Sequence, residues 1–231
     1  MDLENAQKII GYIFINLALL EQAFTHRSYL NEHNQKNNKP FQHNERLEFL
    51  GDAVLELIVT DFLFNKYPEF PEGKLTAIRS SLVNYKTLGS IATELGFNDF
   101  ILLSKGERAD TNERSRLPIL ADCFEAVLGS MYVDGGVDPC YNFLQKVLLW
   151  RSEIIVKNES FRDSKSKLQE YYQSLSKVTP YYKVINEEGR EHDKLFTVAV
   201  MIDSQQLAIG SGRSKQEAEL VAASNALLNI N

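Results

Sequence analysis

The sequence predicts an α+β protein, in which an all-helical domain is followed by a small domain of order α-β-β-β-α. In the first part of the chain, apolar residues recur at helical spacing, as in residues 43–58 and 119–132. Residues 181–210 instead hold three strand-like segments, and in the second of them apolar residues occupy alternate positions. Helical patterns at 164–175 and 213–230 flank these segments.

Length and composition fit two domains. The 231 residues, 44% of them hydrophobic, are enough to bury a sizeable core. The change of pattern places the first domain at residues 1–156, a linker at 157–161 and the second domain at 162–231. No run of about 18 apolar residues occurs, and the N-terminus lacks the pattern of a secretion signal. Cys123 and Cys140 lack metal-ligand spacing. We therefore expect a cytoplasmic protein with reduced thiols and no membrane contact.

The shorter elements of the first domain follow from local signals. Residues 5–11, 16–24 and 137–151 have helical patterns, and a helix from Tyr85 is expected to end at Gly96. These helices are expected to pack around the two longer helical stretches.

Four polar or charged segments interrupt these helices. Residues 25–28, Thr-His-Arg-Ser, fit either a capped helix start or part of a site. Residues 33–42 contain a proline and are expected to form a loop. Glu72 follows two prolines, at the start of a new helix, where an acid usually compensates the helix dipole. Residues 104–118 are charged without periodicity, so we expect mostly a solvated loop there.

The stretch 43–58 carries carboxylates along one helix face. Glu45, Glu48 and Asp52 lie at i, i+3 and i+7, so they share that face. The apolar residues expected to face the core are Leu47, Leu50, Val54, Leu57 and Ile58. Acidic helix faces are usually just solvated, so this pattern alone does not establish a site.

The stretch 119–132 supports the interpretation that the acidic face belongs to a site, because it carries further acids. Asp122 and Glu125 lie at i and i+3, and the small residues Ala126 and Gly129 flank them. Gly51 lies inside the first acidic helix, where glycine costs about 1 kcal/mol relative to alanine. Close helix packing is a physical reason to keep it. If the helices cross at the small residues, the carboxylates that converge are Glu48, Asp52, Asp122 and Glu125.

Converging carboxylates predict a metal site. They would raise one another's pKa values and destabilise the protein unless a divalent cation neutralised them. Ligation by oxygen alone suits Mg²⁺ or Mn²⁺, whereas Zn²⁺ draws on His and Cys. The chemistry implied is phosphodiester hydrolysis, in which a hard cation polarises the phosphoryl oxygen and lowers the pKa of a water molecule. No organic cofactor is expected.

The segments NERLEFLGDAVL (44–55) and ILADCFEA (119–126) resemble the paired signature of the ribonuclease III family, the double-stranded RNA endonucleases. The resemblance runs from about residue 5 to residue 229. It implies an Mg²⁺-dependent homodimer, with Mn²⁺ as a substitute, whose staggered cuts leave 5′-phosphate and 3′-hydroxyl ends.

The resemblance also implies roles for single residues. The expected metal ligands are Glu48, Asp52, Asp122 and Glu125, of which Asp52 and Glu125 are expected to be essential for catalysis. Glu45 and Glu72 match two further catalytic-site acids that line the cleavage valley. Phe49 matches an aromatic residue that the family inserts into a socket on the partner subunit.

The second domain is similar to the double-stranded RNA-binding domain, which recognises the shape of an A-form duplex. Ser214 and Glu217 form an S-x-x-E capping box at the start of its last helix. That helix start carries Lys215 next to Arg213, so it offers free N–H groups and positive charge to phosphates. The residues expected to contact RNA are Gln169, Glu170, His192, Arg213, Ser214 and Lys215.

Net charge limits how RNA can bind. Residues 1–158 hold 16 basic and 21 acidic residues, a net charge of −5, and residues 159–231 hold 9 and 10, a net charge of −1. A nucleic-acid-binding domain is usually basic. The cations of the second domain must therefore gather on one face if it binds RNA.

We predict a homodimeric endonuclease for double-stranded RNA that processes ribosomal RNA precursors and other structured RNAs, messenger RNA among them. A non-catalytic double-stranded RNA-binding relative is the main alternative. Such relatives lose acids at the site, whereas all six acids are present here. A metal-dependent phosphohydrolase for small substrates is a second alternative, and it leaves the second domain unexplained.

Overall fold

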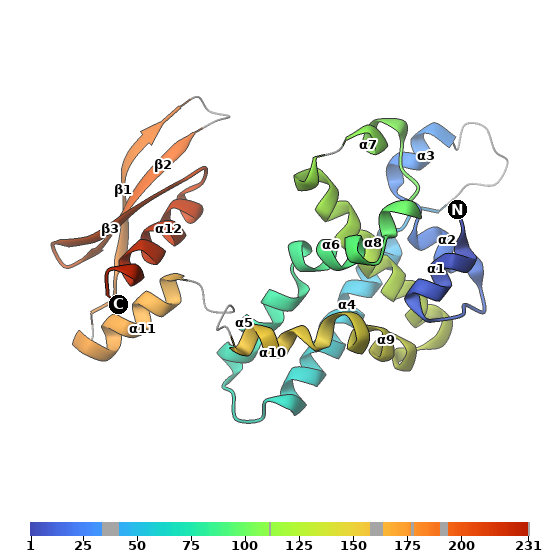
Figure 1. Cartoon of the computed structure of the whole chain (residues 1–231), viewed down its shortest axis with the longest axis horizontal. Coiled ribbons are helices and arrows are strands. Elements are labelled where there is room, and N and C mark those ends of the chain that lie inside the picture. The colour runs from blue at the N-terminus through green and yellow to red at the C-terminus, as the bar shows by residue number, and fades with distance from the viewer. Residues whose placement is uncertain (34–41, 111, 158–163, 177, 190–193, 231) are drawn as a thin grey trace. The chain divides into compact units, whose positions relative to one another are not determined.

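A computed structural model describes residues 1–33, 42–110, 112–157, 164–176, 178–189 and 194–230. The chain divides into two compact units, Met1–Phe161 and Arg162–Asn231. The first unit is helical, and the second combines helices with one antiparallel sheet (Figure 1). The predicted α+β fold class is therefore confirmed. Among the described residues, no helix has the length and apolar character needed to cross a membrane.

The helices of the first unit largely follow the sequence signals. They are α1 (Leu3–Ile10), α2 (Leu17–Ala23), α3 (Arg27–His33), α4 (Glu45–Lys66), α5 (Glu72–Val83), α6 (Tyr85–Glu94), α7 (Lys105–Ala109), α8 (Glu113–Gly135), α9 (Val137–Leu144) and α10 (Arg151–Lys157). Helix α6 stops just before Gly96, which has a left-handed φ of 71° that glycine adopts without strain.

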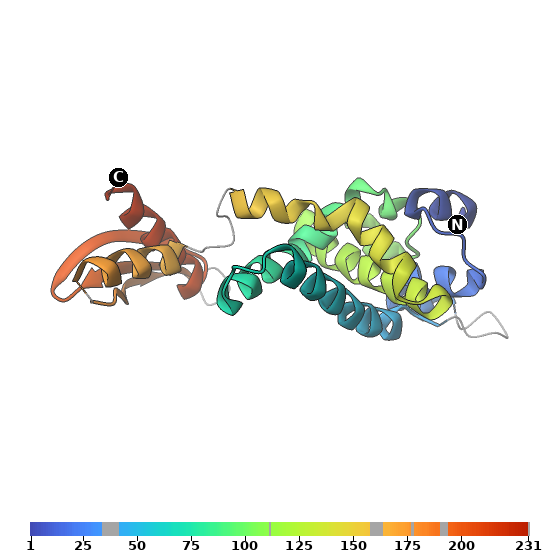
Figure 2. The ribbon, with the colours of Figure 1, turned by 90° about the horizontal axis from the view of Figure 1, so that it is seen from below.

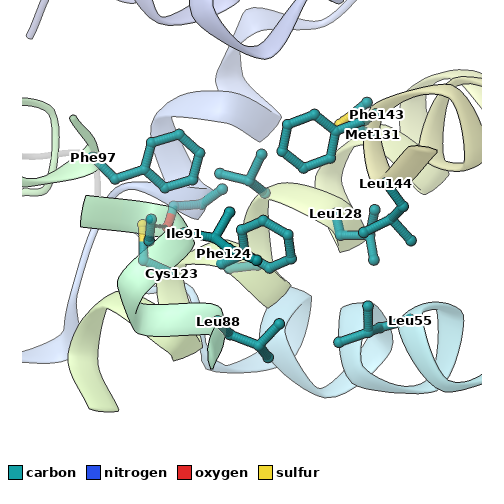
Figure 3. Packing of buried hydrophobic residues seen from close by; sticks show 14 of the residues in the cluster. Leu55, Leu88, Ile91, Phe97, Cys123, Phe124, Leu128, Met131, Phe143 and Leu144 are labelled. Carbon is teal, nitrogen blue, oxygen red and sulfur yellow. Dashed lines mark hydrogen bonds between the residues drawn. The ribbon is translucent and has the colours of Figure 1, made fainter. Parts of the chain in front are cut away.

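The core of the first unit surrounds α8. Its apolar side, predicted to lie opposite the acids, is fully buried. Figure 3 shows this side in contact range of helices α4, α6 and α9. The core residues labelled there are Leu55, Leu88, Ile91, Phe97, Cys123, Phe124, Leu128, Met131, Phe143 and Leu144. Seen from a second direction, α4 and α8 run past each other along much of their length (Figure 2).

Two expectations for the first unit were wrong, those for residues 104–118 and for Leu57. Residues 104–118 are mostly helical, because the Ser104 hydroxyl caps α7 and α8 already begins at Glu113. Pro118 lies inside α8, where packing against α4 and α6 compensates for the hydrogen bond that proline cannot donate. Leu57 is 63% exposed instead of facing the core. The helix expected at 137–151 continues as a π-helical turn at Gln145–Leu149 and then as α10.

The second unit has the predicted α-β-β-β-α order. Its elements are α11 (Ser164–Ser176), β1 (Tyr181–Glu188), β2 (Leu195–Ile202), β3 (Gln205–Gly212) and α12 (Lys215–Leu228). The strands pair antiparallel in the order β1-β2-β3. Helix α12 packs on β2 and β3, and α11 packs on α12 (Figure 1). Val198 and Val200 face these helices and are fully buried, as their alternation predicted.

Candidate active site

Two glycines let α4 and α8 cross in close contact. A Cβ atom at Gly51 would collide with the carbonyl oxygen of Glu125, and a Cβ atom at Gly129 would collide with that of Leu47. Both glycines are buried, so backbone lies directly against backbone at the crossing. The close approach predicted from the small residues is confirmed, and it places the acidic edges of the two helices together.

Three of the predicted acids border one pocket, and Asp52 and Glu125 are not among its lining residues. Glu45 and Glu48 of α4 and Asp122 of α8 border a cavity of about 750 Å³. Glu48 and Asp122 are half-buried, and Glu45 is exposed. Glu125 is half-buried and Asp52 is exposed. Carboxylates that were distant in the sequence are therefore gathered where α4 and α8 meet.

Burial and mutual repulsion shift the pKa values of these acids. Burial raises the pKa of Glu48 to about 7, and the carboxylates of Asp122, Glu45 and Asp52 add repulsion. Burial likewise raises the pKa of Glu125 to about 8, with repulsion from Asp52, Asp122 and Glu48. Burial also raises the pKa of Asp122. Shifts of this size arise where like charges share a partly desolvated site.

The donor set fits a hard divalent cation. All of the gathered ligands are carboxylate oxygens, which suit Mg²⁺ or Mn²⁺, and a cation there would remove the repulsion that raises their pKa values. Among the described residues, no three His, Cys, Asp or Glu side chains already stand close enough together to bind an ion. The carboxylates would therefore have to turn toward an ion as it enters.

Several polar residues around the pocket were not predicted as part of it. Asn44, Glu107 and Ile119 border the pocket. His26, Arg27 and Ser28 of the Thr-His-Arg-Ser segment border it too, and α3 begins at Arg27. Arg27 Nη1 lies 3.3 Å from Glu45 Oε1. The Thr-His-Arg-Ser segment could be recognised in the sequence by its density of polar residues. Asn44 could not, because only its place beside Glu45 distinguishes it there.

Glu56 is a further acid that sequence analysis missed. It lies four residues after Asp52 on α4, and it adds to the repulsion that raises the pKa of Glu125. Its carboxylate is 2.9 Å from Arg79 Nε on α5. The i+4 spacing from Asp52 was visible in the sequence and could have identified it.

The second unit presents its expected RNA-binding residues on two helices. Gln169 and Glu170 are exposed on α11, and Arg213 and Lys215 are exposed at the start of α12. His192 lies outside the described residues.

The start of α12 is held by the predicted capping box. Ser214 Oγ accepts a hydrogen bond from the Glu217 N–H at 3.1 Å, and Glu217 Oε2 accepts one from the Arg213 N–H at 2.7 Å. The Lys215 ammonium lies 3.5 Å from a carboxylate oxygen of Glu187 on β1.

Each of the two units matches a known protein family. Residues 16–152 match the family model described as ribonuclease-III-like, and residues 164–230 match the model of the double-stranded RNA binding motif. The chain belongs to the ribonuclease III family. The family resemblance inferred from the sequence of residues 44–55 and 119–126 is thereby confirmed.

Individual ribonuclease III proteins are similar over nearly the whole chain. Ribonuclease 3 of Bacillus velezensis is 48% identical over 97% of this chain and 88% of its own length. Ribonuclease 3 of Bdellovibrio bacteriovorus is 42% identical over 97% of this chain and 94% of its own length. The solved nuclease domain of ribonuclease III from Campylobacter jejuni is 34% identical, with a TM-score of 0.56, and covers 65% of this chain and 97% of that chain.

Glu72 and Phe49, also assigned by the ribonuclease III resemblance, lie apart from the acids gathered where α4 and α8 cross. Glu72 stands at the start of α5, where its carboxylate accepts a hydrogen bond from Thr76 Oγ1 at 2.9 Å. It borders a separate, mainly apolar cavity of about 430 Å³, together with Phe64 and Arg79. Phe49 is 81% exposed on the side of α4 that faces away from the core. A single chain therefore does not bring Glu72 to the four central acids.

Proposed function

We propose that this chain is an endoribonuclease that cleaves double-stranded RNA by Mg²⁺-dependent phosphodiester hydrolysis, with Mn²⁺ as a substitute ion. Family membership makes it a divalent-metal-dependent nuclease, and the double-stranded RNA binding motif indicates the substrate. The observation that carries the proposal is the α4–α8 crossing, which gathers oxygen-donor carboxylates whose mutual repulsion a cation would relieve.

In this mechanism Glu48, Asp52, Asp122 and Glu125 would hold the cation. When bound, it polarises the scissile phosphate and lowers the pKa of the attacking water. Glu48 and Asp122 hold their carboxylates at the wall of the pocket, and Asp52 and Glu125 are the ligands we expect catalysis to need most. Glu45, at the mouth, is oriented by Arg27. The products would carry 5′-phosphate and 3′-hydroxyl ends.

We also propose that the active form is a homodimer. The side of α4 opposite the core carries exposed apolar residues at Phe49, Leu57 and Phe64. Exposed apolar stripes of this kind usually mark an interface. A second copy would also supply an acid such as Glu72 from the partner to the cleavage valley. The solved Campylobacter jejuni nuclease domain is itself described as having a region involved in dimer formation.

The dimer is tested by the mass of the particle in solution. Sedimentation is expected to give about twice the chain mass of 26.3 kDa. Phe49→Ser is expected to shift the protein toward the monomer, whereas Ile154→Ser, at an exposed apolar residue on α10, is expected to leave the dimer intact. A wild-type monomer that cleaves RNA would rule out the role of Phe49.

The second unit would supply duplex binding. Arg213, Ser214 and Lys215 would meet phosphates at the start of α12, while Gln169, Glu170 and His192 would face the minor grooves. Ribosomal RNA precursors and other structured RNAs, including messenger RNAs, are the expected substrates. Both cysteines are free and buried, which suits the reducing cytoplasm in which we place the protein.

The deciding experiment is cleavage of a long perfect RNA duplex in Mg²⁺, in Ca²⁺ and in EDTA. Wild type is expected to cut only in Mg²⁺, and Glu125→Gln is expected to lose about a thousandfold or more in rate while still binding duplex. Asp61→Asn is the matched control and is expected to cut normally, because Asp61 lies on the same helix as Asp52 but is not among the carboxylates that raise the pKa values of Glu48 and Glu125. If wild type binds duplex and never cuts it, the protein is a binding relative.

A further inference from the structure

Asn16, Asn44 and Asn84 stand at helix N-caps in the first unit, and the side chain of Asn44 does not cap its helix. Asn16 Oδ1 accepts a hydrogen bond from the Ala18 N–H at the start of α2. Asn84 Oδ1 accepts hydrogen bonds from the N–H groups of Lys86 and Thr87 at the start of α6. Asn44, at the start of α4, makes no side-chain cap hydrogen bond. Its amide is therefore not used for the role that asparagine usually has at this position.

The backbone of Asn44 is fully engaged. Its N–H donates to the carbonyl oxygen of Thr25 at 2.9 Å, and its own carbonyl accepts from the N–H groups of Leu47 and Glu48 at 2.8 and 2.9 Å. The residue is only 1% exposed. The backbone of the residue is therefore held by three hydrogen bonds, and its side chain is enclosed by the protein.

The side-chain nitrogen of Asn44 is buried, and it has no hydrogen-bond partner in the part of the chain that the structure describes. A buried donor without a partner is unfavourable, and few exist in native proteins. A donor of this kind that borders a functional pocket indicates a partner that arrives with a ligand. Asn44 borders the acidic pocket together with Glu48 and Asp122.

Glu48 is the partner that the geometry favours. Asn44 has helical backbone angles, φ −80° and ψ −15°, so its side chain lies on the same face as that of Glu48 four residues later. The carboxylates must turn toward an ion as it binds, because they are not yet at metal-binding separations.

We propose that Asn44 is a positioning residue of the metal site, whose amide Nδ2–H₂ donates to the Glu48 carboxylate when a divalent cation binds. This inference rests on the proposed function, because it needs a cation at the acidic pocket. Hydrogen bonds to metal-ligating carboxylates fix their orientation, and losing such a bond typically weakens metal binding about 10- to 100-fold. Without the ion, the Nδ2 atom of this amide has no hydrogen-bond partner among the described residues.

The test compares metal affinity with metal-free stability in the full chain. Mn²⁺ is titrated into wild type, Asn44→Leu and Asn44→Ala, and free ion is followed by electron paramagnetic resonance. Leucine is close to asparagine in shape but has no donor. Both variants are expected to weaken Mn²⁺ binding about tenfold or more, while their metal-free unfolding temperatures stay at or above that of wild type.

Asn84→Ala is the matched control, because Asn84 caps a helix of the same unit away from the acidic pocket. It is expected to lower the metal-free unfolding temperature and to leave Mn²⁺ affinity unchanged. The inference is overturned if Asn44→Leu binds Mn²⁺ as wild type does. It is also overturned if Asn44→Leu fails to fold or loses as much metal-free stability as Asn84→Ala, since Asn44 would then be structural.

Failure of the proposed function gives a different result. If wild type itself does not bind Mn²⁺, the metal site is absent and the proposed function fails with it. If wild type binds Mn²⁺ and cuts duplex while the Asn44 variants bind the ion equally well, only the role of Asn44 is lost.

Discussion

In the first unit Gly51 and Gly129 seat α8 on α4, and in the second unit Gly210 and Gly212 seat α12 on the sheet. A Cβ atom at any of the four would collide with backbone or side-chain atoms of the neighbouring element. Close packing at glycine has opposite electrostatic results in the two units. In the first unit it brings like charges into a half-buried pocket, and in the second it holds a helix whose first residues project cations into solvent.

The difference shows how burial decides what a charged group can bind. Gathered carboxylates have raised pKa values, since burial and repulsion both disfavour their charged forms. Such a site gains stability from a compact cation. Arg213 and Lys215 are exposed and can meet the phosphates of a long duplex, although Lys215 also lies 3.5 Å from the Glu187 carboxylate. One unit is thus suited to an ion and the other to an extended polyanion.

The largest expected effect comes from filling the α4–α8 contact. Gly129→Ala is expected to destabilise the first unit by about 3 kcal/mol or more, because the added methyl group collides with backbone. It should also abolish Mg²⁺-dependent cleavage by separating the acids. Gly73→Ala is the control, since nothing lies near its Cβ position, and a gain of about 0.5–1 kcal/mol is expected. Urea unfolding measures the stability of both variants. If Gly129→Ala were as stable as wild type, the close contact between α4 and α8 at Gly129 would be refuted.

A glycine-to-alanine substitution in the second unit is expected to destabilise the second unit alone. Gly210→Ala is expected to cost about 2–3 kcal/mol, because its methyl group would meet the backbone of α12 at Ala222. Calorimetry should show one transition moving down while the transition of the first unit stays. Ser211→Ala, at the exposed neighbouring position, should change little. A shift of both transitions would mean that the two units unfold together.

The pKa values of the acidic pocket predict how metal-free stability depends on pH. Glu48 and Glu125 have pKa values of about 7 and 8, above the ordinary value of 4.5. The folded protein therefore binds more protons, so stability is full below about pH 4.5 and is lost as pH rises through 7 and 8. After allowance for solvent screening, the loss should be on the order of 1–2 kcal/mol.

Urea unfolding at pH 5.5, 7 and 8.5 measures this loss in EDTA and in saturating Mg²⁺. Mg²⁺ should remove it, because the bound cation favours the ionised carboxylates. Glu125→Gln should flatten the profile in EDTA. A stability that rises with pH in EDTA would contradict the cited pKa shifts.

The smallest expected effect concerns Glu187 in the second unit. Its carboxylate lies 3.5 Å from Lys215 and 3.8 Å from Lys194, so it competes with phosphates for both ammonium groups. Glu187→Gln should tighten duplex binding about two- to fivefold, in keeping with exposed ion pairs worth less than about 1 kcal/mol. The fall of affinity with salt should become steeper.

Glu188→Gln is the matched control for Glu187→Gln. It makes the same charge change at the neighbouring position, where the carboxylate accepts a hydrogen bond from Asn186 Nδ2 instead. Fluorescence anisotropy over a range of salt concentrations compares the variants. Equal tightening by both would show that only net charge matters and that Glu187 has no particular competition with RNA.

The local patterns of the sequence were enough to predict much of this molecule. The spacing of Glu45, Glu48 and Asp52 predicted one acidic face because a helix repeats every 3.6 residues. Gly51 and Gly129 predicted close contact, since glycine inside a helix needs a reason. The Ser214–Glu217 capping box and the three strands were likewise local, and the structure has them where they were expected.

Features that depend on which residues pack against one another were decided only by the tertiary structure. Leu57 was assigned to the core because it is apolar, but no element of the described chain buries it, and it is 63% exposed. Residues 104–118 have little apolar periodicity, and they became helical through a cap and through packing of α8. The unpartnered amide of Asn44 could not be seen in the sequence, because burial and missing hydrogen bonds are set by neighbours distant along the chain.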